Sequence, residues 1–175
     1  MSTAVQHSAT WPTTVGACCI VVGGLSLFGG CLAFTGMAEI EQLYTAIPFG
    51  EGELSDELRE QLRSTEPAAW IASFAAMLNI VFSIVLAGAG MALLQRAPKA
   101  PMTLVVWSVA YILFSICASV VNWVPRMELV QQVEEIEGMF LAQIFISMPL
   151  YFALPIFLLI YLNRKQTRNE VASWR

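Results

Sequence analysis

Charged side chains are scarce in this chain. Only 13% of its 175 residues are Asp, Glu, Lys or Arg, and 57% are hydrophobic. An average soluble domain is about 25% charged. The net charge of −4 also leaves no excess of basic side chains of the kind that binds nucleic acid. The composition therefore excludes most soluble and disordered classes, and it predicts a membrane protein whose partner is the lipid bilayer and not DNA or RNA.

The few charges are also missing from long parts of the sequence. Four stretches carry none of them: residues 1–38, 67–95, 100–125 and 138–163. About 20 mostly apolar residues in a helix cross the hydrocarbon core of a bilayer, whereas barrel strands would alternate apolar with polar residues. We expect an all-α fold, a single integral membrane domain over residues 1–175 with a bundle of four transmembrane helices. The expected spans are residues 12–37, 67–95, 101–125 and 138–163.

The segments between these stretches differ in the sign of their charge. The segments after the first and third stretches are acidic, with eight acids against two bases and four acids against one. The short segment Arg96–Lys99 and the C-terminal tail are basic. Because Lys and Arg are retained on the cytoplasmic side, the sequence predicts that both termini are cytoplasmic. The expected location is a plasma or inner membrane, crossed several times.

The first acidic loop contains one local pattern. Leu54, Leu58 and Leu62 recur at steps of four, and Ser55 and Asp56 are residues that favour a helix N-terminus. We expect a short amphipathic helix in this first external loop, lying on the membrane surface.

Histidine and all charged residues are missing from the expected spans. The single histidine, His7, precedes the first span, and no spacing typical of zinc sites or of catalytic serine motifs occurs. Proton pumps and ion-coupled carriers place ionisable side chains inside the membrane, and the four stretches hold no Asp, Glu, Lys or Arg. The sequence accordingly predicts a protein that is not an enzyme, with no catalytic residue, no cofactor and no metal site.

Small residues repeat along one side of the first span. They form a heptad pattern, named here the small-residue seam, at Gly16, Cys19, Gly23, Ser26, Gly30 and Ala33. Helices in lipid associate through close backbone contact, which small side chains permit, and a period of 3.5 residues implies a shallow left-handed crossing. We interpret the seam as a helix interface. Its neighbour is either another span of the same chain or a second protein subunit.

Uncharged polar side chains recur near the middle of the second, third and fourth spans. Counted along each helix, six of them lie within about 6 Å of the expected midplane: Asn79, Ser83, Tyr111, Ser115, Ser147 and Tyr151. A polar group facing lipid at this depth costs several kcal/mol, so these side chains are expected to point inward. They either form interhelical hydrogen bonds or line a polar cavity.

Tryptophans mark the expected membrane boundaries. Trp11 and Trp107 fall at the predicted inner boundary, and Trp70 and Trp123 fall at the outer one. Because amphipathic rings prefer this position, we interpret all four as interfacial anchors.

Two functional interpretations follow from these patterns. The small-residue seam and the missing chemistry favour a non-catalytic structural or accessory subunit, or a self-assembling scaffold, in a membrane complex. Its partners are then other membrane protein subunits or copies of itself. The alternative is a small oligomeric channel or transporter, with an uncharged polar pathway lined by the third and fourth spans.

Overall fold

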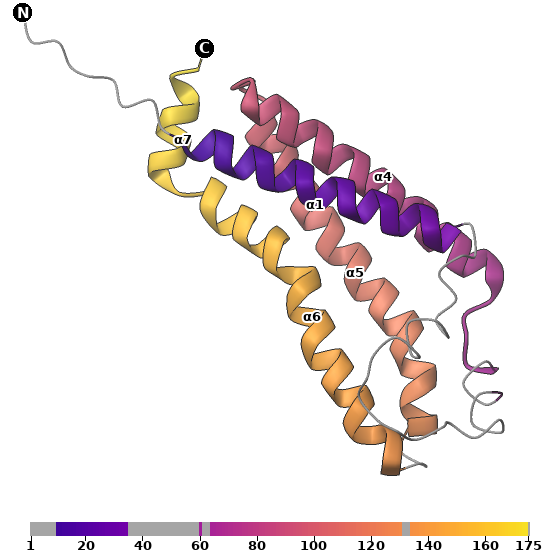
Figure 1. Cartoon of the computed structure of the whole chain (residues 1–175). Coiled ribbons are helices and arrows are strands. Elements are labelled where there is room, and N and C mark those ends of the chain that lie inside the picture. The colour runs from indigo at the N-terminus through magenta and orange to yellow at the C-terminus, as the bar shows by residue number, and fades with distance from the viewer. Residues whose placement is uncertain (1–9, 35–59, 61–63, 131–133, 175) are drawn as a thin grey trace, which may run out of the picture.

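A computed structural model describes residues 10–34, 60, 64–130 and 134–174 of the chain. Every regular element in these residues is a helix, and the prediction of an all-α fold is confirmed for them. The elements are α1 (Trp11–Phe34), α4 (Ala69–Leu94), α5 (Ala100–Val130), α6 (Glu134–Leu162) and α7 (Lys165–Ala172), shown in Figure 1. The short helix expected around Leu54, Leu58 and Leu62 lies outside the described residues.

Three of these helices are long and apolar enough to cross a membrane. Their apolar segments are Trp11–Leu32, Ala69–Leu94 and Ala100–Pro125, with 22, 26 and 26 residues. At 1.5 Å per residue they extend over about 33 to 39 Å, enough for a hydrocarbon core of about 30 Å. In α6 the apolar segment is shorter, Tyr151–Leu162. These three helices are typical of an integral membrane protein.

The last two long helices extend beyond the expected third and fourth spans. α5 continues through Pro125 to Val130, and α6 begins at Glu134 and continues through Pro149 and Pro155. Four of the nine added residues are Glu, which has a high helix propensity. Proline is tolerated inside membrane helices because neighbouring groups satisfy the carbonyls that it frees.

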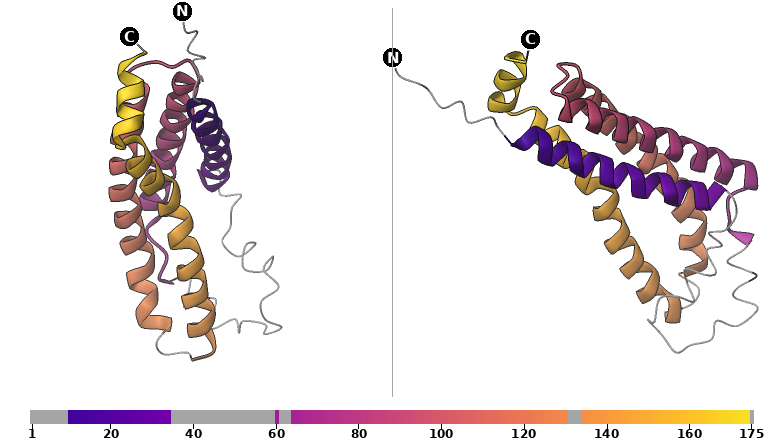
Figure 2. Two further views of the ribbon diagram at one scale, coloured as in Figure 1. Left: turned by 90° about the vertical axis from the view of Figure 1, so that its left-hand side faces the viewer. Right: turned by 45° about the horizontal axis from the view of Figure 1, so that its top comes forward.

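The four long helices form two antiparallel pairs, α1 with α4 and α5 with α6 (Figures 1 and 2). The pairs meet at the end of the molecule that carries α7 and the turn between α4 and α5, and they diverge toward the opposite end. Among the described helices α1 packs extensively only on α4. One long side of α1 therefore faces away from the other described helices.

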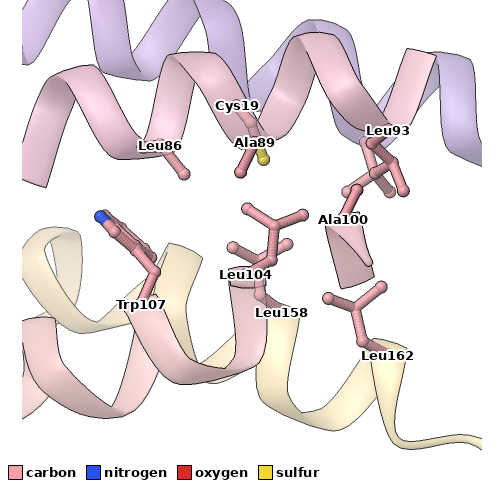
Figure 3. Packing of buried hydrophobic residues seen from close by; sticks show 10 residues of the cluster. Cys19, Leu86, Ala89, Leu93, Ala100, Leu104, Trp107, Leu158 and Leu162 are labelled. Carbon is pink, nitrogen blue, oxygen red and sulfur yellow. The ribbon is translucent and has the colours of Figure 1, made fainter. Parts of the chain in front are cut away.

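The buried apolar core lies where the two pairs meet. Leu93 of α4, Leu104 of α5 and Leu158 of α6 are completely buried there together with Cys19 of α1 (Figure 3). Elsewhere the helices expose large apolar side chains, such as Leu25 at 68% and Met102 at 73%. Lipid or another apolar surface must cover side chains of this kind.

Candidate functional site

The seam of small residues on α1 lies directly against α4. A Cβ atom at Gly16 would be 2.8 Å from the Gly90 carbonyl oxygen, and one at Gly23 would be 2.9 Å from the Ser83 carbonyl oxygen. At Gly30 the nearest atom would be a side-chain carbon of Ile80 at 3.0 Å. The first two distances are too short for a real Cβ atom and the third is tight, so glycine at positions 16 and 23 lets the two backbones approach closely.

The other members of the seam are distributed along the same helix. Cys19 is completely buried, and its Cβ atom lies 2.9 Å from the place that a Cβ atom on Gly90 would occupy. Ser26 is half-buried, and the side chain of Ala33 lies outside the described residues. The structure thus brings Gly16, Cys19, Gly23 and Gly30 against a neighbouring span of the same chain.

The α4 side of this contact has a heptad pattern of its own. Six α4 residues lie nearest to the buried α1 glycines, and five of them have offsets of 0, 3, 7, 10 and 14: Ile80, Ser83, Ala87, Gly90 and Leu94. The sixth is Asn79. Two facing heptad patterns keep the same sides of both helices in contact along their length. Small residues meet at Gly16 with Gly90 and at Gly23 with Ala87, and Gly30 faces the larger Ile80. The matching pattern on α4 was the sequence signal that could have identified the neighbour.

The opposite side of α1 is named here the open face and comprises Val21, Gly24, Leu25 and Phe28. Leu25 is 68% exposed and Phe28 is 66% exposed. A Cβ atom at Gly24 would meet no described atom within 4 Å. Gly23 therefore contacts α4 and the next residue, Gly24, does not, because each step along a helix turns by about 100°.

Two of the six midplane polar residues lie on the side of α4 that faces α1. The Ser83 hydroxyl is buried and donates a hydrogen bond of 2.7 Å to the Asn79 carbonyl oxygen. The Asn79 side-chain nitrogen lies 3.4 Å from the place that a Cβ atom on Gly30 would occupy. Both side chains therefore belong to the α1–α4 interface.

The other described members of the polar set lie on α5 and α6. Tyr111 stacks on Trp107 with ring centroids 4.9 Å apart, and its edge meets Phe82 of α4. Ser115 is buried and hydrogen-bonded to Tyr111, whereas Tyr151 is 56% exposed. The side chain of Ser147 lies outside the described residues. The structure consequently places Asn79 and Ser83 at the α1–α4 interface and Tyr111 at the α4–α5 interface, and it leaves Tyr151 exposed.

Buried hydroxyl groups find their partners close by. The Ser108 hydroxyl is fully buried and donates to the Leu104 carbonyl oxygen at 2.8 Å, one turn earlier in the same helix. Among the described side chains that are not exposed, no buried polar atom lacks a hydrogen-bond partner. Hydroxyls satisfied in this way need no water or ligand.

Trp107 is not an interfacial anchor, and that prediction is wrong. It is only 5% exposed, and its indole nitrogen donates a hydrogen bond of 2.8 Å to the Phe82 carbonyl oxygen of α4. It shares a face of α5 with Leu104, which packs in the core (Figure 3). Ser108, the next residue after Trp107, is also buried. A tryptophan at the membrane boundary donates its indole N–H to water or headgroups, whereas the buried Trp107 donates it to a carbonyl oxygen of α4.

A cluster that the sequence did not reveal joins the start of α1 to the C-terminal helix. The Trp11 indole nitrogen donates a 2.7 Å hydrogen bond to a carboxylate oxygen of Glu170. The same indole stacks on Trp174 at 5.6 Å and meets the edge of Tyr161 at 5.7 Å. The guanidinium of Arg164 lies 5.6 Å from the centre of the Tyr161 ring. We call these five residues the terminal cluster.

One sequence signal could have identified the terminal cluster. Thr167, Glu170, Val171 and Trp174 occur at offsets of 0, 3, 4 and 7, the spacing of one helix face. Thr167 is buried, and its hydroxyl donates to the Tyr161 carbonyl oxygen at 3.1 Å. An open hollow of about 330 Å³ lies between this face and Trp11.

The described residues contain no group of three or more His, Cys, Asp or Glu side chains arranged to hold a metal ion. All four cysteines are free thiols, and only Cys19 is buried. No model of a known protein family matches the chain, and neither a curated protein nor a solved structure matches it significantly.

Proposed function

We propose that the chain is a non-catalytic subunit of a membrane complex that crosses the membrane four times, with both termini in the cytoplasm. The single observation that carries the proposal is the position of α1. Along most of its length this helix packs on α4 alone among the described helices, and it presents the apolar open face on the opposite side. The open face is suited to a second membrane protein or a second copy.

The four-span topology draws support from α6 and from the charges. α6 has 29 residues, pairs with α5, and is free of charged residues from residue 138 onward. The basic turn Arg96–Lys99 and the basic helix α7 lie at the same end of the molecule (Figure 1). A common end for the basic segments is what retention of Lys and Arg on the cytoplasmic side requires.

The channel alternative has less support from the described side chains. Ser83 and Ser108 donate to carbonyl oxygens of their own helices, and Asn79 and Ser83 lie beside α1. A polar pathway along the third and fourth spans needs hydroxyl groups that remain available to a passing solute.

Particle mass in a mild detergent tests the subunit proposal. Gly24→Leu places a bulky side chain on the open face, and Gly88→Leu is the matched control on α4, where a Cβ atom would also meet no described atom. We expect the native particle to exceed the mass of one chain with its detergent. Gly24→Leu should reduce that mass to a single chain, and Gly88→Leu should not.

Two results would contradict the proposal. The first is a native particle that contains only one copy of this chain and no companion. The second is specific solute flux in liposomes that contain only this protein, which would favour the channel.

A further inference from the structure

An apolar groove of about 520 Å³ runs along the outside of the α4–α5 contact. Its walls include Val81 and Val85 of α4 and Met102 and Val106 of α5. All four side chains are substantially exposed, although they lie within helices suited to span a membrane. The volume is within the range of about 300 to 1,000 Å³ that is typical of small-ligand sites.

Two residues that carry polar groups line one end of the groove, whose exposed lining is otherwise almost entirely apolar. They are Lys99 and Thr103, and the Thr103 hydroxyl donates to the Lys99 carbonyl oxygen at 3.2 Å. Lys99 belongs to the turn between α4 and α5, which carries Arg96 as a second base and no acid. The groove therefore combines a long apolar wall with a basic residue, Lys99, at one end.

The length of the groove matches half of a bilayer. Ala110, which also lines the groove, is eleven positions after Lys99, and eleven helical steps extend about 16 Å. Half of the hydrocarbon core is about 15 Å thick. An acyl chain lying in the groove would thus reach the bilayer midplane, with its phosphate at the level of Lys99.

We propose that this groove binds an anionic phospholipid, with one acyl chain along Val85 and Val106 and the phosphate against the Lys99 ammonium. Basic residues at the ends of grooves between membrane helices are suited to anionic headgroups. The inference requires only that α4 and α5 lie in the membrane. It can therefore fail without affecting the proposed subunit role, and the subunit role can fail without affecting it.

Native mass measurement of the purified full chain tests the headgroup contact. The protein is titrated in detergent with phosphatidylglycerol and, in parallel, with phosphatidylcholine. We expect one tightly held phosphatidylglycerol and a preference for it that Lys99→Gln lowers about fivefold. Lys165→Gln, which removes a base of α7 outside the groove, is the matched control and should leave the preference unchanged. Inorganic phosphate should not displace the lipid.

Filling the groove tests the acyl chain. Val106→Trp and, from the other wall, Val85→Phe should abolish retention of either lipid, whereas Val109→Trp on an exposed part of α5 outside the groove should not. Equal retention by the filled variants and the control would overturn the proposal. The filled variants could instead lose a bound protein and keep their lipid. That result would assign the groove to a helix of a partner protein, and it would also overturn the lipid proposal.

Discussion

Single glycines decide where two helices of this protein touch. Gly23 and Gly24 are neighbours in the sequence, yet a Cβ atom on Gly23 would clash with the α4 backbone, and one on Gly24 would meet no described atom within 4 Å. The difference arises from the helical repeat alone, which turns one residue toward α4 and the next away from it. Whether a glycine of α1 contributes to packing therefore depends on the side of the helix on which it lies.

The first prediction compares leucine at these two positions in the chain purified by itself in detergent. Gly23→Leu should lower the free energy of unfolding by about 2 kcal/mol, because overpacking a close contact forces the helices apart. Gly24→Leu should change the free energy by less than about 0.5 kcal/mol. Denaturant titration followed by circular dichroism measures both. Equal losses for the two variants would show that the α1–α4 contact does not form as described.

At the scale of elements, α7 is a short helix that one face holds in place. Eight residues are too few for a stable isolated helix in water. α7 therefore depends on the hydrogen bond from Trp11 to Glu170, the stacking of Trp174 and the burial of Thr167. Because Trp11 begins α1, these contacts also attach the start of the first span to the end of the chain.

The second prediction concerns this attachment. Glu170→Ala removes the acceptor of the Trp11 hydrogen bond, and we expect amide exchange in α7 to accelerate about fivefold, equivalent to about 1 kcal/mol. Asn169→Ala is the matched control, because Asn169 is exposed on the same helix. Hydrogen exchange read by mass spectrometry measures the rates. Unchanged exchange in Glu170→Ala would mean that α7 folds without the terminal cluster.

At the scale of the whole molecule, the two antiparallel pairs converge at one end and diverge toward the other (Figure 1). The completely buried leucines lie at the converging end, which also carries the basic turn and α7 (Figures 1 and 3). The basic segments, which orient a membrane protein, and the completely buried leucines thus lie at the same end of the molecule.

The third prediction fixes the orientation of the molecule by cysteine labelling. In a variant whose four native cysteines are replaced by alanine, Ser173→Cys should react only with a reagent that enters the cytoplasm. Ser55→Cys, in the acidic first loop, should react with an impermeant reagent added outside. Labelling of position 55 only from the cytoplasmic side would refute the proposed topology.

The sequence by itself determined the helical class and the apolar helices, because both depend on local features. A stretch of 26 uncharged, mostly apolar residues such as 100–125 must satisfy its backbone hydrogen bonds internally in lipid, and a helix does so without any partner. The heptad of small residues on α1 likewise indicated an interface, since its period can be read without knowing the neighbour.

Only the tertiary structure decided which surfaces meet. The seam on α1 allowed either a neighbouring span or a second subunit, and the structure places Gly16 against Gly90 of α4. Trp107 satisfied a rule for membrane boundaries, yet it is buried, because the Phe82 carbonyl oxygen on a helix 25 residues away in sequence accepts its hydrogen bond. Contacts of this kind depend on how two helices are rotated and shifted relative to one another. The sequence of one helix alone does not contain that information.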